Sequence, residues 1–186
     1  MANLLPIDKL NNLQTDITEI FSKENITEAD KEEIEDSVLD LLIMAYMYGW
    51  TSASDELDTE IIPDTNKVDE SVNKQIAGKN WKDRVGEYLQ NGTAEEILRV
   101  ADTEMVRIYN ESKLDFAEGC EFAVYKTWGT QLDDKVRDTH FYLEGVKVEV
   151  GDRFYTFDGD SALAPGGFSL VQNNVNCRCT LELSRD

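Results

Sequence analysis

The sequence has few basic residues and only one histidine. Eighteen lysines and arginines stand against 38 aspartates and glutamates among its 186 residues, so the formal net charge is −20. Proteins that bind nucleic acid draw most of their affinity from neutralising phosphates with Lys and Arg. Because the sequence shows no basic patch, we expect no strong direct binding to nucleic acid.

Cysteine is also scarce, with three residues in the whole chain. An odd number at this low density argues against a secreted scaffold held by disulfides. The first residues, MANLLPIDKLNN, lack a basic region followed by an apolar run, so we expect no export signal and synthesis in a reducing cytoplasm. The thiols are therefore expected to be free.

Long hydrophobic runs are missing. The longest apolar stretch, residues 41–48, is far shorter than the roughly 20 residues that a membrane-spanning helix needs. We therefore expect no membrane association. Hydrophobic residues nevertheless make up 41% of the chain, which is enough for a packed core in a protein of this length.

Acidic residues gather at the start of the chain. Residues 1–62 contain 15 acidic and three basic side chains, which account for −12 of the net charge of −20. Such a segment either stays solvated or binds a basic surface on a partner. Both alternatives stay open from the sequence.

The first part of the chain is predicted to be helical. Residues 6–23 form a first amphipathic helix, and Thr27 with Asp30 has the pattern of a capping box that opens a second. Gly49 is expected to end or bend this second helix. The polar residues 62–66, which include a proline, mark a predicted boundary.

Two further helices precede a change of pattern. They are predicted over 81–91 and from a capping box at Thr93 and Glu96 to Gly119. After Gly119 the apolar residues alternate, which predicts strands at 121–128, 146–150 and 177–183 separated by glycine-containing turns.

These patterns predict an α+β fold in which N-terminal helices precede a small antiparallel sheet with hairpin loops. We divide the chain into an acidic helical region, residues 1–62, and a second domain, residues 77–186.

The second half of the chain carries a series of short motifs in a fixed order. They read YKTWGTQLDDKVRDTHFYLEG, LAPGG and NNVNCRC. This order resembles the Mu F-like phage head morphogenesis family, also called minor head proteins, over about residues 77–183. The residues that carry the resemblance are Lys126, Trp128, Arg137, Asp138, His140, Gly145, Phe154, Pro165, Gly166, Asn176, Cys177, Arg178 and Cys179.

The resemblance implies a structural role in a phage. It predicts a minor head protein that associates with the portal protein, and with other capsid or scaffold proteins, and that acts in head morphogenesis and in DNA packaging or delivery. It implies a place in the host cytoplasm during assembly and then inside the virion head near the portal vertex. One departure is Asp102-Thr103-Glu104, where the family usually has Arg-Thr-Glu.

The Cys-Arg-Cys run at the end of the chain has three interpretations. Side chains alternate along a strand, so Cys177 and Cys179 point to one face and Arg178 to the other. In the first interpretation the two thiols pack in the core without any cofactor, and Arg178 binds an acid such as Asp138. We expect the motif residues from Arg137 to His140 to converge with residues 176–179.

The second interpretation is a zinc site. Zinc takes Cys and His ligands in tetrahedral sites, and His140, the only histidine, belongs to the same motif series as Cys177 and Cys179. Cys120 is a candidate fourth ligand. Structural zinc sites usually have two paired ligand spacings, whereas one arm here is a single histidine.

The third interpretation is catalysis by a small Cys/His-dependent or zinc-dependent hydrolase or toxin-like domain. Cysteine and histidine can act as nucleophile and base, and Asp138 is placed to orient His140 as in a triad. The sequence shows neither an oxyanion hole nor a substrate pocket. We therefore expect a protein that binds partners and is not an enzyme.

Overall fold

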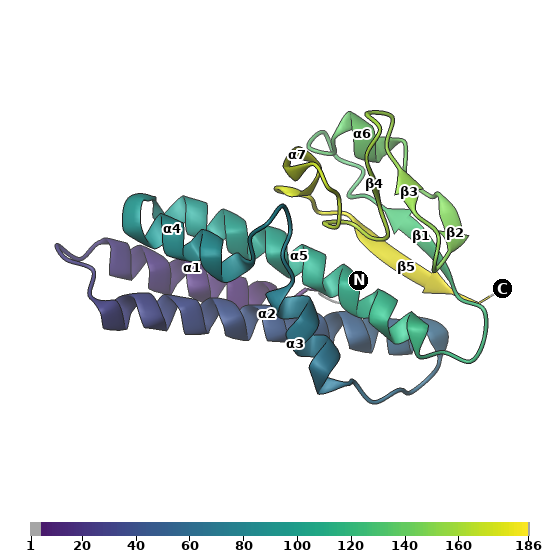
Figure 1. Cartoon of the computed structure of the whole chain (residues 1–186), viewed down its shortest axis with the longest axis horizontal. Helices are drawn as coiled ribbons and strands as arrows, with labels where there is room; N and C mark the ends of the chain where they lie inside the picture. The colour runs from purple at the N-terminus through teal and green to yellow at the C-terminus, as the bar shows by residue number, and fades with distance from the viewer. Residues whose placement is uncertain (1–4, 186) are drawn as a thin grey trace.

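The computed structural model describes residues 5–185, in which helices precede two small antiparallel sheets (Figure 1). The helices of this part of the chain are α1 (Ile7–Phe21), α2 (Glu28–Leu57), α3 (Thr65–Asn73), α4 (Trp81–Asn91), α5 (Ala94–Glu118), α6 (Asp138–Phe141) and α7 (Val171–Asn174). The predicted α+β fold class is confirmed. We call α1–α5 the helical layer and residues 125–184 the sheet unit.

The start of α2 follows the local pattern that the sequence predicted. The Asp30 N–H donates to Thr27 Oγ1 at 3.2 Å, and the Thr27 N–H donates to Asp30 Oδ2 at 2.8 Å. This capping box satisfies two backbone groups that the helix itself leaves unpaired. A second box, between Thr93 and Glu96, opens α5.

Gly49 does not end α2, so the first of the two predicted alternatives is wrong. The helix continues through this glycine to Leu57. A Cβ atom at Gly49 would collide with the Tyr109 carbonyl oxygen on α5. The glycine is needed because the backbones of α2 and α5 come this close together, a contact that the local sequence does not reveal.

The helical layer has one continuous apolar core. Helices α2 and α5 pack along each other, and α1 and α4 also lie against α5. The residues at its centre include Ile17, Ile34, Val38, Leu41, Leu42, Ala45, Trp81, Val85, Ile97, Ala101, Met105 and Phe116. Residues 5–62 therefore share a core with α5, the helix that precedes the sheet unit. None of the helices within residues 5–185 has the length and apolar content needed to cross a membrane.

The sheet unit contains a three-stranded antiparallel sheet in the order β2-β1-β5 and a separate pair, β3 with β4. The strands are β1 (Tyr125–Gly129), β2 (Lys147–Glu149), β3 (Phe154–Tyr155), β4 (Ser161–Ala162) and β5 (Thr180–Ser184). Strands β1 and β5 begin later than predicted. Residues 121–124 instead connect α5 to the sheet, and residues 177–179 approach the sheet without pairing in it.

A second, smaller core lies within the sheet unit. It is built around Trp128, whose ring packs edge-on against Phe154 at a centroid distance of 5.0 Å. Its buried members are Trp128, Leu143, Phe154, Ala162, Ala164, Phe168, Cys177, Cys179 and Leu181. The two cysteines therefore belong to a core separate from that of the helical layer.

Side chains of α5 cover the open edge of β5. The Asn110 amide donates to the Cys179 carbonyl at 3.0 Å, and its oxygen accepts from the Leu181 N–H at 2.8 Å. The Lys113 ammonium donates to the Leu181 carbonyl at 2.6 Å. An uncovered edge strand presents unpaired backbone groups that other chains can pair with. In this protein, buried helix side chains take the place of a neighbouring strand.

Helix α2 joins the same junction through Glu56. This carboxylate accepts a hydrogen bond from the Lys113 ammonium at 2.5 Å and another from the Leu183 N–H at 2.8 Å. The helix that carries much of the early acidic charge is thus bonded directly to the last strand. Figure 1 shows β5 lying beside α5 at this junction.

Candidate functional site

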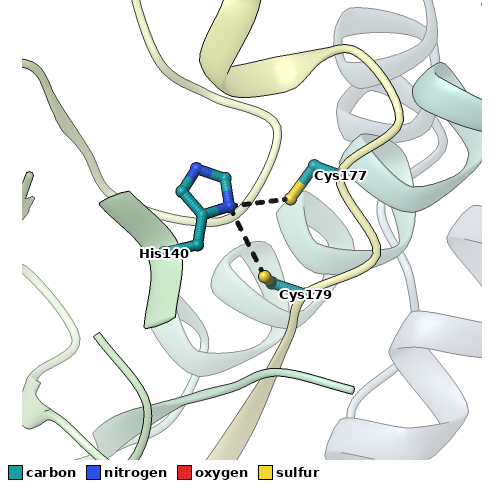
Figure 2. Close-up of side chains that lie close together, drawn as sticks. All are labelled: His140, Cys177 and Cys179. Carbon is teal, nitrogen blue, oxygen red and sulfur yellow. Dashed lines mark hydrogen bonds between the residues drawn. The ribbon is translucent and has the colours of Figure 1, made fainter. Parts of the chain in front are cut away.

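Three side chains from the predicted motif series meet inside the sheet unit. His140 lies on α6, and Cys177 and Cys179 lie in the segment that leads into β5. The His140 Nδ1 atom is 3.6 Å from the sulfur of each cysteine (Figure 2). All three side chains are buried, with 1%, 2% and 4% of their surface exposed respectively. The potential ligand atoms lie within 4.8 Å of one another.

Aromatic packing sets the orientation of the His140 ring. The imidazole stacks on Phe168 at a centroid distance of 5.3 Å and meets the edge of Trp128 at 5.5 Å. Its Nε2 atom is buried and has no hydrogen-bond partner within residues 5–185. The ring therefore presents Nδ1 to the two sulfurs because of how its faces pack, without help from a hydrogen bond at Nε2.

A tight turn positions the cysteine segment. Asn176 has a left-handed backbone, with φ +56°, and its N–H donates to Thr103 Oγ1 on α5 at 3.2 Å. The Cys177 N–H then donates to the Asn174 carbonyl at 3.0 Å. Asparagine tolerates this backbone conformation better than most residues. The turn is thus anchored to the helical layer just before the first cysteine.

Arg178 binds a different acid from the one predicted. Its guanidinium donates to Asp133 Oδ2 at 2.8 Å and Oδ1 at 2.6 Å. These two hydrogen bonds lower the pKa of Asp133 to about 2. The prediction of a bond to Asp138 is wrong: Asp138 begins α6, whereas Asp133, in the loop that follows β1, is the acid that binds Arg178.

The arrangement also lacks the predicted triad. Within residues 5–185, no hydrogen bond joins Asp138 to His140. Nor does Cys120 join the group as a fourth ligand, because it packs at the edge of the helical core with its sulfur 3.7 Å from the Phe116 carbonyl. Of the candidate metal ligands, three therefore come together: His140, Cys177 and Cys179.

Lys126 and Arg137 bind backbone carbonyls. The Lys126 ammonium is fully buried and donates to the carbonyls of Val150 and Leu163, each at 2.7 Å. Burial lowers the pKa of Lys126 to about 8. Arg137 donates to the Val175 carbonyl. Both side chains tie loops of the sheet unit together.

The two thiols differ in acidity. A hydrogen bond from Cys179 lowers the pKa of Cys177 well below its usual range, and His140 acts in the same direction. The pKa of Cys179 is raised, because it is hydrogen-bonded to Cys177 and buried. A thiolate at Cys177 is chemically a nucleophile or a metal ligand, but its sulfur lies in the core.

The sequence predicted no role for two buried polar residues, Asn174 beside the site and Glu104 in the helical layer. The Asn174 side-chain amide bonds to both backbone groups of Phe168. Its oxygen accepts from the Phe168 N–H at 2.9 Å, and its nitrogen donates to the Phe168 carbonyl at 2.7 Å. Glu104 is buried on α5 and binds Arg84 at 2.6 Å and Arg107 at 2.7 Å. A polar residue within an apolar helical stripe is a signal that could have pointed to Glu104.

Comparison with known proteins gives one family and two curated relatives. The model of the family described as "Phage Mu protein F like protein" matches residues 65–182. The minor head protein GP7 of Bacillus phage SPP1 is 30% identical over 111 residues, which cover 57% of this chain and 36% of that protein. The NAD(+)–arginine ADP-ribosyltransferase EFV of Enterococcus faecalis (strain ATCC 700802 / V583) is 34% identical over 88 residues.

The second match covers 46% of this chain and 18% of the ADP-ribosyltransferase. The chain thus spans well under half the length of each of these relatives. No solved structure matches the chain.

Proposed function

The chain belongs to the Phage Mu protein F-like family, as its motif series predicted, and on this basis we propose that it is a minor head protein that associates with the portal. In this proposal it acts in head morphogenesis and in DNA packaging or delivery, by binding and without catalysis. The observation that carries the proposal is the family match over residues 65–182, supported by the similarity to a protein named as a minor head protein.

The acidic face of α2 is the proposed contact with the portal. Glu32, Glu33 and Asp36 are exposed, and none of them forms an ion pair within residues 5–185. On the other side of the same helix, Ile34 and Val38 are buried in the core. The helix therefore holds these carboxylates on a rigid surface, where they suit a basic partner. Complementary charge steers association and weakens with salt.

Co-expression with the portal protein of the same phage tests this proposal. Size-exclusion chromatography with light scattering should show the two proteins eluting together at a defined ratio. A triple variant, Glu32→Gln with Glu33→Gln and Asp36→Asn, should weaken the complex about tenfold or more at low salt, since it removes three charges from the contact.

The matched control neutralises three exposed acids on other surfaces, Glu121→Gln with Asp134→Asn and Glu149→Gln. It changes the net charge by the same amount and should leave portal binding unchanged. If the two triple variants behave alike, the α2 face is not the contact. If the unmodified chain elutes as a monomer that ignores the portal, portal association itself is wrong.

The net charge of −20 also fits a role beside DNA. A surface that repels phosphates allows DNA to pass without being held. We place the protein in the host cytoplasm during assembly and afterwards inside the virion head near the portal vertex. Contacts with other capsid or scaffold proteins belong to the same proposal.

A small Cys/His-dependent or zinc-dependent hydrolase or toxin-like domain is the second candidate. One observation favours it, the contact of a low-pKa Cys177 thiol with His140 at 3.6 Å. Against it, the Cys177 side chain is 2% exposed, and a buried cysteine of this kind is usually inert. Reaction with a thiol-specific reagent in the folded state tests access. Rapid labelling of Cys177 would favour the Cys/His-dependent form of this candidate, and labelling of Cys120 alone in the metal-free protein would remove the basis for that form.

A further inference from the structure

One imidazole nitrogen faces two thiol sulfurs in the core of the sheet unit. A neutral histidine nitrogen has a single lone pair, so it can accept a hydrogen bond from only one thiol. His140 Nδ1 is nevertheless equidistant from Cys177 and Cys179, at 3.6 Å from each sulfur. Simple packing of two thiols does not require this symmetry, whereas a shared metal ion does.

The donor spacings match tetrahedral zinc. Zinc lies about 2.3 Å from cysteine sulfur and about 2.0–2.1 Å from histidine nitrogen, and at a tetrahedral angle these bond lengths place nitrogen and sulfur about 3.6 Å apart. The same geometry places two sulfurs about 3.8 Å apart. The structure has both nitrogen–sulfur distances at 3.6 Å and all three donor atoms within 4.8 Å of one another.

We propose that His140 Nδ1, Cys177 Sγ and Cys179 Sγ bind one Zn²⁺ ion. Both sulfurs bind as thiolates, whose two negative charges balance the charge of the ion, and any proton still on a thiol is released on binding. The imidazole binds as the neutral ring with its proton on Nε2. This inference goes beyond the proposed head function and does not depend on it.

The ligands are held in place before any ion binds. Phe168 and Trp128 fix the His140 ring through their packing. On the cysteine side, Asn174 accepts from the Cys177 N–H, and the Cys179 carbonyl accepts from Asn110 on α5. Packing and backbone hydrogen bonds therefore orient the three donors, although His140 Nε2 lacks, within residues 5–185, the hydrogen-bond partner that metal-bound histidines usually have. The site thus has anchors on both sides of the three donor atoms.

The fourth position is open to a small ligand. A cavity of about 10 Å³ adjoins the three donor residues, and Arg137 and Asn176 are among the residues that line it. This is close to the smallest space that holds one water molecule, about 10–15 Å³. We therefore assign three protein ligands and one water to the ion. Zinc would join α6 to the segment before β5.

Metal analysis of the full chain, purified under a phosphine reductant and dialysed after zinc addition, tests the proposal. The unmodified protein should hold about one zinc per chain, and Cys177→Ser, Cys179→Ser and His140→Ala should each hold less than about a tenth. Cys120→Ser is the matched control, because this cysteine lies outside the group, and it should keep the full equivalent.

A second measurement on the unmodified chain guards against variants that fail to fold. Cobalt(II) added to the metal-free protein should produce the charge-transfer absorption of cobalt–thiolate bonds, and saturating zinc should raise the melting temperature. The proposal is overturned if the reduced protein holds less than about a tenth of an equivalent and zinc leaves its melting temperature unchanged. It is equally overturned if folded Cys177→Ser keeps the full equivalent.

Discussion

The helical layer and the sheet unit are stabilised by different kinds of contact. In the helical layer, α2 and α5 bury a long series of apolar side chains, and non-directional burial of this kind supplies most of the folding free energy. In the sheet unit the strands are two to five residues long and the core is small. Lys126, Arg137 and Asn174 connect its loops through backbone carbonyls.

The difference shows where this protein is sensitive to substitution. Burial spread over many residues tolerates the loss of one contact, whereas a small unit held by a few directional bonds does not. The sheet unit also relies on α5 to cover its edge. The two regions are therefore expected to respond differently to equally conservative changes.

The largest effect is expected where the two regions join. Asn110→Leu keeps a similar volume but leaves the buried Cys179 carbonyl and Leu181 N–H without their partner. We expect a loss of about 3–4 kcal/mol in the free energy of unfolding, since each orphaned group costs about 1–3 kcal/mol. Chemical denaturation followed by circular dichroism measures it. Asn11→Leu on the exposed face of α1 should change stability little, and equal losses in both variants would refute the junction's importance.

Gly49→Ala tests the closest approach within the helical layer. The added methyl group meets the Tyr109 carbonyl oxygen, so α2 and α5 must separate. We expect a loss of about 2–3 kcal/mol, at the upper end for overpacking, even though alanine is the better helix former. Thermal unfolding measures the change. Gly86→Ala on α4, where a methyl group meets no atom within 4 Å, should stabilise the protein or leave it unchanged; a similar loss there would contradict the argument.

Lys126→Met tests the polar links of the sheet unit. It removes the donor to the Val150 and Leu163 carbonyls and should cost about 2 kcal/mol at neutral pH. Lys147→Met on the exposed surface of β2 is the matched control and should cost little. Urea unfolding curves compare the two.

Lys126 also predicts a pH dependence. Its folded-state pKa is about 8 and its ordinary value is 10.5, so between these pH values the unfolded chain binds the proton more often than the folded protein. The contribution of Lys126 to the free energy of unfolding therefore rises as pH rises from about 8 toward 10.5. The advantage of the unmodified protein over Lys126→Met should grow across that window. An advantage that stays constant would contradict the assigned shift.

The smallest effect is expected at Asp115 in the helical layer. Burial raises the pKa of this carboxyl to about 6, although the Tyr46 hydroxyl donates to it at 2.9 Å. A raised acid pKa gives stability that is complete below pH 3.8 and is lost as pH rises through 6. The free energy of unfolding of the unmodified protein relative to that of Asp115→Asn should thus fall between pH 4 and pH 7. The fall should be less than about 1 kcal/mol, because solvent screens the Asp115 carboxyl. Unfolding at several pH values measures it, and a rising advantage would have the wrong sign.

The helix starts could be predicted because they depend on neighbouring residues. The capping box of Thr27 and Asp30 lies within a single turn of chain, and the structure has both of its hydrogen bonds. The motif series led to the family in the same way, since it depends on the order of residues alone. Period-two alternation located β1, β2 and β5 but not β3 and β4, and it placed the starts of β1 and β5 too early. At β5 the reason is that Cys177 and Cys179 alternate like strand residues while lying outside the paired register.

Contacts between distant residues were decided by the tertiary structure. The pairing of Arg178 with Asp133, the role of Gly49 and the cover that Asn110 provides for β5 all join residues that are far apart in the chain. From the sequence follow the acidity, the helix caps, the α+β order and the candidates His140, Cys177 and Cys179. The 3.6 Å spacing of their donor atoms follows only from the fold, because the packing of the His140 ring and the anchoring of the cysteine turn on α5 together set it.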